Sequence, residues 1–459
     1  MGLSTFIDEG DPYREPEPDE SSPVETEPSP VIESDLEITV IEEDAAAQAF
    51  ALPATPKLDV DESAISGGLI EVVRDAALAG DNLIVSGGTD SFDHFVVLDI
   101  ATGEVKWQQH GEDVLPGADV EVWAPGLDAK FAPPSVMQGP DGWLVLVPYT
   151  GLNFRVAGET SESGVAALSA EDGSVQWTAP LFEYNPDHET NQILNGIAVS
   201  GGTVVADVGV VRTDNTAAPL PEAAFADFRT VALDAADGSM LWEAPGTSVF
   251  NVLGSLEVAG GMVYAADAEQ MVLGAPSEIV GLDLATGTGL WTFAEEDRYV
   301  RVETAVAGAA MLHLSSNPEW THPAEQSVLL DAATGETLAS VDTQVDCVND
   351  GITRMACTFA DLGGSEPVVQ LFTFDAADPG IGIAADPLPS SVRWPTALLS
   401  GWIVIQDEDT RNLVVDAAGK GVSSAKQFGV PVTASEAYAV VAGRADGAIL
   451  DDLNLYAIE

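Results

Sequence analysis

Two cysteines are the residues whose spacing most directly indicates chemistry. Cys347 and Cys357 are the only cysteines, and "CVNDGITRMAC" (347–357) reads as two strands around an Asn-Asp-Gly turn. Directly opposed residues on antiparallel strands lie about 4.5–5.5 Å apart at Cα, within disulfide range. We therefore expect a disulfide and an oxidising compartment. Two buried reduced thiols are one alternative; a redox dithiol is another, but the C-x-x-C spacing is missing.

The histidines indicate no metal site. The segment "DHE" at 187–189 could contact a metal ion, but no second histidine lies at ligand spacing from His188. We interpret each histidine as an ordinary surface or core residue.

Aromatic, arginine and histidine side chains in the long segments between strands are the candidates for recognition. Such side chains anchor protein interfaces, and loops on a rigid scaffold commonly carry function. The predicted binding residues are Trp123, Phe154, Arg155, Tyr184, His188, Arg212, Trp320 and His322. The alternative is that these loops only fill the mouth of a central channel.

A repeated phrase defines the elements that must position these loops. "VVLDIATGEVKW" (96–107) and "VGLDLATGTGLW" (280–291) hold Asp, Thr, Gly and Trp in one register. Related phrases occupy 166–177, 231–242, 328–339, 371–380, 413–422 and 453–459. A period of roughly 40–50 residues is typical of an array of one supersecondary unit.

Each phrase predicts a β-hairpin. The aspartate at the end of the strand can accept a hydrogen bond from the backbone N–H two residues on, and the glycine supplies the positive φ of the turn. The aspartates are Asp99, Asp234, Asp283, Asp331, Asp375 and Asp416, and the glycines are Gly103, Gly173, Gly238, Gly287 and Gly335. The outgoing strands carry Trp107, Trp177, Trp242 and Trp291, which we interpret as packing between neighbouring units rather than as a ligand platform.

Two further β runs precede each hairpin, so the sequence predicts four strands in each of eight units. This pattern favours an all-β fold, an eight-bladed β-propeller over residues 61–459, present as a monomer. The last unit ends at its third strand, so we expect a strand within residues 45–66 to close the ring. The long insertions 108–134, 149–164, 181–191, 211–228 and 315–326 should then meet on one face.

Residues 1–60 are rich in acids and prolines, which predicts a disordered acidic arm. Within this arm "LEITVIEED" (36–44) alternates apolar residues. It is interpreted as part of a solvated tail, the alternative being a strand added to a partner's sheet.

The net charge excludes several partners. Seventy-five acidic and 16 basic residues give −59, so the chain cannot replace the counterions of nucleic acid or bind an anionic membrane surface. No apolar run is long enough for a transmembrane helix, and the N-terminus does not read as a signal peptide. We expect either an acidic exported protein whose export or anchor segment is missing from this chain, or a protein of a salt-adapted cytosol.

The pattern A-x-D-x-x-T-G-x-x-x-W resembles the PQQ-like repeat of the quinoprotein dehydrogenase superfamily over roughly residues 67–459. It weakens in the later copies, where Ala339 replaces the Trp. The resemblance implies one of two groups: alcohol or sugar dehydrogenases dependent on pyrroloquinoline quinone and calcium, or non-enzymatic propellers such as the lipoprotein scaffold of the outer-membrane β-barrel assembly machine. The dehydrogenases clamp the quinone beneath a ring of two adjacent cysteines, which this sequence lacks.

We therefore predict a non-enzymatic scaffold or binding propeller of the bacterial cell envelope, without a cofactor. It would recognise a protein or a glycan through its loop-rich face. The alternatives are the quinone- and calcium-dependent dehydrogenase and a structural, salt-adapted envelope protein without a dedicated ligand.

Overall fold

The computed structural model describes residues 32–34, 36–41, 56–60, 72–89, 92–110, 118–120, 135–151, 161–184, 188–212, 220–249, 258–267, 278–317, 325–350, 352–361, 368–384, 388, 392–399, 402–407, 412–416, 430–434, 438–446 and 449–457. Almost all regular structure in these ranges is β-strand, with one described 3-10 helix, η2 (Glu222–Asp227). The all-β class predicted from the sequence is confirmed.

Antiparallel meanders of mostly four strands follow one another along the chain. The first half contains β4 (Val72–Ala79), β5 (Asn82–Thr89), β6 (Phe92–Asp99) and β7 (Val105–His110); β9 (Ser135–Gly139), β10 (Gly142–Gly151), β11 (Ser161–Ser169) and β12 (Val175–Tyr184); β13 (Thr190–Ser200), β14 (Thr203–Arg212), β15 (Arg229–Asp234) and β16 (Met240–Pro245); and β18 (Val258–Ala259), β19 (Met262–Asp267), β20 (Ile279–Asp283) and β21 (Gly289–Phe293). Two short strands extend these sheets: β8 (Ala118–Val120) pairs with β10, and β17 (Thr247–Ser248) pairs with β19.

The second half repeats the arrangement. It contains β22 (Tyr299–Val306), β23 (Ala309–Ser315), β24 (Gln326–Asp331) and β25 (Thr337–Val341); β26 (Asp346–Asn349), β27 (Arg354–Asp361), β28 (Val368–Asp375) and β29 (Ile381–Ala384); β30 (Val392–Leu399), β31 (Trp402–Asp407) and β32 (Asn412–Val415); and β33 (Val430–Ala434), β34 (Tyr438–Asp446) and β35 (Ile449–Ala457).

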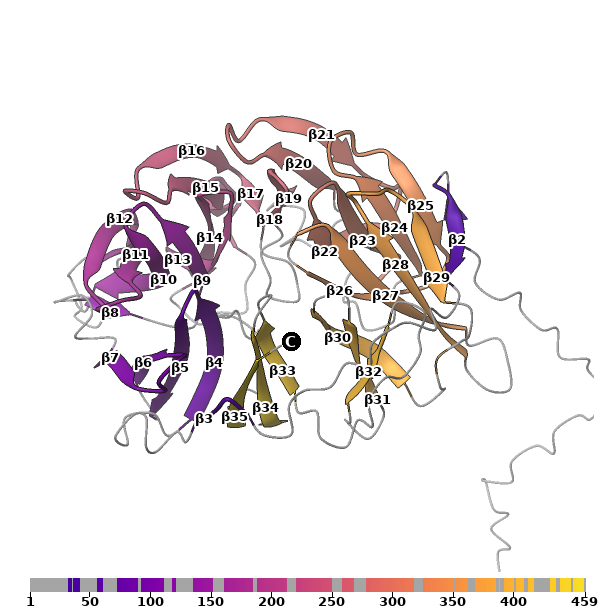
Figure 1. Ribbon diagram of the computed structural model, residues 1–459. Coiled ribbons are helices and arrows are strands. Elements are labelled where there is room, and N and C mark those ends of the chain that lie inside the picture. The colour runs from indigo at the N-terminus through magenta and orange to yellow at the C-terminus, as the bar shows by residue number, and fades with distance from the viewer. Residues whose placement is uncertain are drawn as a thin grey trace, which may run out of the picture.

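The sheets follow one another around a common centre in chain order (Figure 1). Their first strands contact one another in the cycle β4, β9, β13, β18, β22, β26, β30, β33 and back to β4. This cycle is the arrangement of a propeller. The count of eight blades stays a prediction, because the β30–β32 sheet has three described strands. In addition, the β33–β35 and β4–β7 meanders are joined into one sheet by the pairing of Leu450 in β35 with Val73 in β4, so they are not separate sheets.

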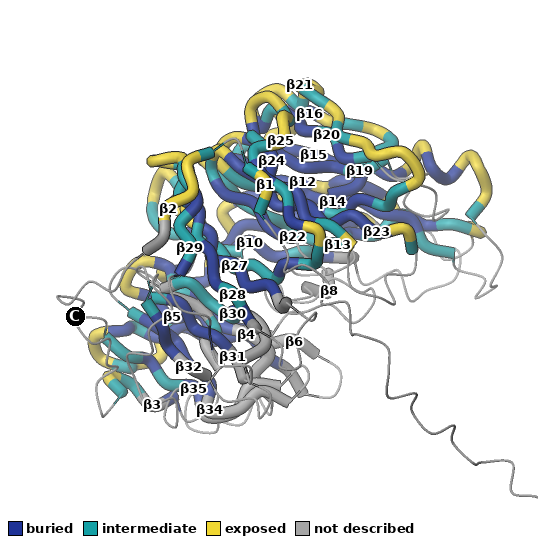
Figure 2. The backbone as a smooth tube through the Cα atoms, turned by 90° about the vertical axis from the view of Figure 1, so that its right-hand side faces the viewer, coloured by how far each residue is buried: buried dark blue, intermediate teal, exposed yellow. Residues whose placement is uncertain are grey.

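The hydrophobic core lies between neighbouring sheets, and the buried residues (dark blue in Figure 2) lie mainly in the central strands. One such layer brings Leu146 of β10 and Val165 of β11 together with Val204 and Val208 of β14. Because each sheet buries both faces against its neighbours, its central strands read as continuous apolar runs, such as "TVVADVGVVR" of β14.

The hairpin corners have the geometry that the phrase predicts. At the first corner Asp99 Oδ1 accepts hydrogen bonds from Thr102 N at 2.8 Å and Thr102 Oγ1 at 3.0 Å, while Gly103 has φ 74°. The Thr102 donors hold the pKa of the Asp99 carboxyl below its ordinary value. These aspartates are therefore used to build the turns.

Two segments of the arm are strands on the outside of the propeller. β1 (Ile32–Ser34) pairs antiparallel with β25, and β2 (Ile38–Ile41) pairs parallel with β29, so residues 32–41 span two neighbouring sheets (Figure 2). Ile32 and Leu36 pack against the core layer beneath them. The expected disorder of residues 1–60 is therefore wrong for these segments. The reason is that the alternating residues find an open edge on this chain's own sheets.

A third arm strand, β3 (Leu58–Val60), pairs antiparallel with β35 and takes the outer position of the β33–β35 sheet. Lys57 N also donates to Leu455 O at 2.7 Å. This outer position is filled by a segment from the opposite end of the chain.

Candidate functional site

The four repeat tryptophans lie between sheets. Each indole Nε1 donates to a backbone carbonyl in the corner of the next sheet along the chain. The pairs are Trp107 to Ala170 (3.0 Å), Trp177 to Ala235 (2.9 Å), Trp242 to Leu284 (2.7 Å) and Trp291 to Ala332 (2.8 Å). The donors of these rings are satisfied within the fold, so the indoles fix the sheets to one another.

The corner glycines are required by these rings as well as by the turn. A Cβ atom at Gly238 would lie 2.5 Å from Cε3 of Trp177, and Gly238 has φ 72°. Gly173 stands in the same relation to Trp107, and Gly335 to Trp291. The tryptophan of one phrase and the glycine of the next phrase thus form one inter-sheet contact.

The two cysteines form a disulfide, as expected. Cys347 and Cys357 are opposed in the β26–β27 ladder, with Cα atoms 4.1 Å apart. Asp350 holds the turn between the two strands, because its Oδ1 accepts from the backbone N–H groups of Ile352, Thr353 and Arg354 at 2.8–3.0 Å. The disulfide thus joins the first two strands of one sheet.

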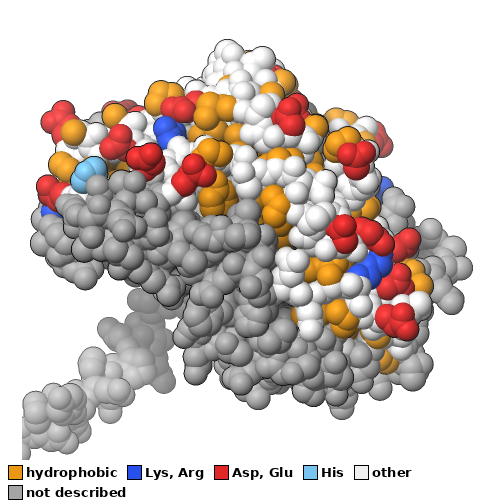
Figure 3. All heavy atoms as spheres, turned by 90° about the vertical axis from the view of Figure 1, so that its left-hand side faces the viewer, with side chains coloured by type: hydrophobic (Ala, Val, Ile, Leu, Met, Phe, Trp, Pro, Cys, Tyr) orange, Lys and Arg blue, Asp and Glu red, His pale blue; other side chains and the backbone are white. Residues whose placement is uncertain are grey.

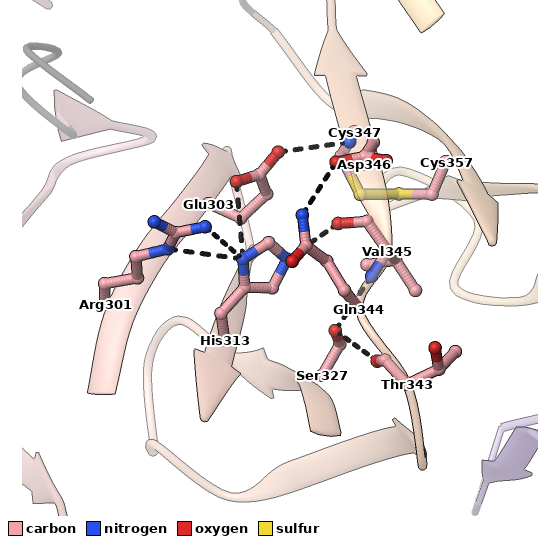
Figure 4. A network of polar contacts seen from close by, with 10 residues as sticks. All are labelled: Arg301, Glu303, His313, Ser327, Thr343, Gln344, Val345, Asp346, Cys347 and Cys357. Atoms are coloured by element: carbon pink, nitrogen blue, oxygen red, sulfur yellow. Dashed lines mark hydrogen bonds and ion pairs between the residues drawn. A yellow bond between two sulfur atoms is a disulfide. The ribbon is translucent and has the colours of Figure 1, made fainter. Parts of the chain in front are cut away.

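A buried polar cluster lies next to the disulfide, on β22, β23 and the segment 342–347 (Figure 4). Its centre is the fully buried His313, whose Nε2 is 2.6 Å from Val345 O and whose Nδ1 is 3.2 Å from Arg301 Nη2. A guanidinium can only donate, so Nδ1 is the acceptor and Nε2 carries the proton. His313 is therefore neutral, and burial together with the Arg301 charge lowers its pKa to about 3.

Arg301 is balanced by carboxylates rather than by the histidine. Glu303 Oε2 is 3.6 Å from His313 Nδ1, but a neutral imidazole makes no ion pair with it. Burial lowers the pKa of the Arg301 guanidinium, and the charges of Glu303 and Asp346 oppose that shift. Glu303 also accepts from Cys347 N at 3.3 Å. The cluster therefore holds the entry into β26 against β22.

The β13–β16 sheet contains a counterpart of this cluster. Asp207 is fully buried on β14 at the position that His313 takes on β23, because each pairs with the residue four positions before the corner aspartate of the next strand: Asp207 with Thr230, and His313 with Ser327. Its Oδ1 accepts from Val249 N at 2.9 Å, and its Oδ2 accepts from Ser248 Oγ at 3.0 Å and Asn195 Nδ2 at 2.8 Å. Both clusters bind the segment that enters the next sheet.

The sequence predicted no role for Asp207 or Arg301, and it predicted His313 only as an ordinary surface or core histidine. The available signal was a polar residue inside a strand that is otherwise apolar throughout, as in "TVVADVGV" and "AAMLHLS". Because two unlike residues, a carboxylate and an imidazole, perform the same task in two sheets, we interpret the position as structural.

Of the predicted loop-rich face, the structure describes the end of β12, the start of β13 and the end of β14. Exposed His188 and Glu189 precede β13, and Arg212 Nη2 donates to Glu189 Oε1 at 2.8 Å. Tyr184 is the last residue of β12. The structure thus brings His188 and Arg212 to one end of the β13–β14 pair, while Trp123, Phe154, Arg155, Trp320 and His322 lie outside the described residues.

One insertion of this face is folded onto the sheet. In 211–228, the helix η2 buries Phe225, and Phe228 follows it into a small core with Val210. Gln192 Nε2 donates to Asp227 O at 2.8 Å. This insertion is therefore a packed platform beside Arg212.

The opposite face has a shallow polar cavity between the β4–β7 and β9–β12 sheets. It is lined by Asp81, Lys106, Asp141, Trp143 and Glu171, among others. Lys106 Nζ lies 2.6 Å from Glu171 Oε2, so its one ammonium group is paired across the boundary. We assign it no ligand.

The residues present do not fit a pyrroloquinoline quinone site. Cys347 and Cys357 are joined across a strand ladder, whereas the clamp implied by the resemblance needs a ring between adjacent cysteines. In the described part of the chain, no three His, Cys, Asp or Glu side chains are grouped to hold a metal ion.

Comparison with known proteins finds a family model that is similar to the central repeats. Residues 161–344 match the family model described as outer membrane protein assembly factor BamB. No curated protein matched the chain. No helix in the described ranges is long and apolar enough to cross a membrane.

Solved structures similar to this chain share little sequence with it. BamB from Moraxella catarrhalis is 14% identical, with a TM-score of 0.42 over 89% of this chain and 100% of its own. A europium-containing methanol dehydrogenase is 12% identical, with a TM-score of 0.40 over 95% and 98%. Quinohemoprotein alcohol dehydrogenase from Comamonas testosteroni is 11% identical, with a TM-score of 0.41 over 90% and 77%. Residues 161–344 are therefore similar to this family, and the repeated Asp, Gly and Trp contacts agree with a PQQ-like repeat.

Proposed function

We propose that this protein is a non-enzymatic propeller of the bacterial cell envelope that recognises a protein or a glycan through its loop-rich face. The observation that carries the proposal is the use of the repeat's polar groups. The corner aspartates bond their own turns and the indoles bond the next sheet, as at Asp99 and Trp107. The repeat therefore supplies a rigid scaffold, and recognition is left to its loops.

The envelope location is supported by two observations. The Cys347–Cys357 disulfide is a feature of oxidising compartments, and the matched family is described as an outer membrane protein assembly factor. A net charge of −59 excludes nucleic acid and favours a partner that is neutral or basic.

The binding surface that we propose is centred on Arg212 and His188, beside the η2 platform. Arg212 is one of 16 basic residues in the whole chain, and it is held at the end of β14 by Glu189. The predicted residues Trp123, Phe154, Arg155, Tyr184, Trp320 and His322 would extend this surface. An arginine among aromatic side chains is the usual composition of an interface anchor.

Capture from a solubilised envelope fraction by the full chain, with the captured species identified by mass spectrometry, tests this proposal. The double variant Trp123→Ala/Trp320→Ala and the variant Arg212→Ala are each expected to lose the captured partner while their Tm is unchanged. Lys106→Ala, on the opposite face, is the matched control and should retain it. Variants that lower Tm without changing capture would instead favour loops that only fill the channel mouth, and no captured species would favour a structural protein.

The dehydrogenase alternative is tested separately. Titration of the full chain with pyrroloquinoline quinone and calcium is expected to give no saturable chromophore and no dye-linked turnover of alcohols or aldoses. Saturable binding with turnover would overturn the non-enzymatic proposal.

A further inference from the structure

The outer strands of the sheets differ in how they resist pairing with another strand. Exposed sheet edges attract further strands, and proteins protect them with proline, lysine or a covering segment. Lys106 lies in β7, Pro180 in β12 and Pro245 in β16. The outer strands β25 ("TLASV") and β29 ("IGIA") have no such residue, and these two are covered by β1 and β2.

β21 has neither kind of protection, and among the described outer strands it shares this only with the four-residue β32. The β21 sequence "GLWTF" contains no proline and no charged residue, and within the described ranges β21 pairs only with β20. Leu290 of β21 is 51% exposed. Figure 2 shows β21 at an exposed rim of the molecule.

Comparison with β25 shows what an added strand does at such an edge. Trp291 and Ala339 occupy the same position after the corner bulge, so Leu290 corresponds to Leu338. Leu338, under β1, is half-buried and its carbonyl accepts from Ser34 Oγ at 3.1 Å, whereas Leu290 is exposed. Every position from 290 to 293 is more exposed than its counterpart in β25.

We propose that the free edge of β21 docks an extended, basic segment of a partner protein as an additional antiparallel strand. The segment pairs with Trp291–Phe293 as β1 pairs with Ala339–Val341, and an aliphatic side chain of the segment covers Leu290. This surface is distinct from the loop-rich face, and the proposal does not depend on recognition there.

Charge decides between the possible occupants. The strand runs into the exposed residues Glu295, Glu296 and Asp297, and Figure 3 shows carboxylates spread over one side of the molecule with few basic side chains among them. A second copy of this chain also has a net charge of −59, so it would be repelled from this edge. A lysine- or arginine-bearing strand is attracted instead.

The test uses the full chain and two fluorescent peptides. One copies residues 31–41, and the other is the same peptide with Glu33→Lys, Asp35→Lys and Glu37→Lys. The basic peptide should bind at low salt and more tightly than the acidic one. Leu290→Lys should weaken its binding by about tenfold, the loss expected for one exposed leucine contact. Leu241→Lys, the same position on proline-ended β16, is the matched control and should leave affinity unchanged.

Hydrogen exchange locates the peptide. Protection of amides 291–293 on binding supports the proposal. Protection of β25 or β29 instead, equal binding to the Leu290→Lys and Leu241→Lys variants, or no binding of the basic peptide at low salt would overturn it. A dimer in sedimentation that Leu290→Lys abolishes would also overturn it, in favour of a second copy.

Discussion

Leu58 packs against Gly103 where the two ends of the propeller meet. A Cβ atom at Gly103 would lie 2.7 Å from Cδ1 of Leu58, the same relation that Gly173 has to Trp107 at the next boundary. β3 therefore gives the last sheet an outer strand and also places a side chain in the position that the repeat tryptophan occupies elsewhere. The expected closing strand within residues 45–66 takes this form, and its contribution to stability is open to test.

Removal of residues 1–66 should lower Tm by about 5 °C or more, because it removes β1, β2 and β3 from three sheet edges. Removal of residues 1–30, which leaves all three strands, is the control and should change Tm little. Thermal unfolding followed by circular dichroism gives the comparison; equal Tm values for the two truncations would refute closure by β3.

Gly238→Ala should destabilise the protein by about 2–3 kcal/mol, the sum of left-handed backbone strain and a clash with the Trp177 ring. Gly246→Ala is the matched control, because Gly246 has φ 73° but a Cβ atom there would meet nothing within 4 Å. This variant should be destabilised by about 1 kcal/mol, from backbone strain alone. Urea unfolding separates the two effects. Equal losses would show that the indole does not constrain the corner.

The neutral state of His313 predicts a pH dependence. Its folded pKa is about 3, whereas an unfolded histidine has a pKa of about 6.5. Between these values only the unfolded chain binds the proton, so the free energy of unfolding falls as the pH falls through this window. Between about pH 7.5 and 5.5 the free energy of unfolding of the protein should fall by about 1 kcal/mol more than that of the His313→Gln variant. The glutamine amide is a suitable replacement because it can donate to Val345 O and accept from Arg301. Parallel pH profiles in urea unfolding would contradict a neutral histidine.

The disulfide should stabilise the protein by up to about 3 kcal/mol, the value for closing a loop of this length. Dithiothreitol should therefore lower the free energy of unfolding, and it should have no effect on the double variant Cys347→Ala/Cys357→Ala. The native, non-reduced protein should show no free thiol in mass spectrometry; two free thiols would exclude the bond.

Self-repulsion should make stability depend on salt. The net charge of the chain is −59. Raising NaCl from about 0.05 M to 1 M shortens the screening length to about 3 Å and should therefore raise Tm by several degrees. The same osmolality of sucrose, which does not screen charge, is the control. A Tm that rises equally with sucrose would assign the effect to solvent exclusion.

Several features could be predicted from the sequence because they repeat within a dozen residues. The Asp-Gly corner, the tryptophan four residues later and the opposed cysteines are local patterns, and turn chemistry together with strand register is sufficient to interpret them. The candidate recognition residues were assigned to loops, but Tyr184 and Arg212 are the last residues of β12 and β14, and five of the eight lie outside the described residues. Of these, the structure describes His188 and Arg212 at one end of the β13–β14 pair, with Arg212 bonded to Glu189.

What only the tertiary structure decided depends on contacts between distant segments. The alternation in residues 36–44 indicates a strand, but no local pattern gives the partners of β1, β2 and β3, because their pairing depends on which sheet edges other parts of the chain leave open. For Asp207 and His313 the local pattern shows only a polar residue in an apolar strand. Their shared role depends on contacts with the segment that enters the next sheet. The sequence by itself determined the repeating unit and its corners. The folded ring decided which edges are covered, which buried polar groups are paired, and that the edge of β21 has no partner strand among the described residues.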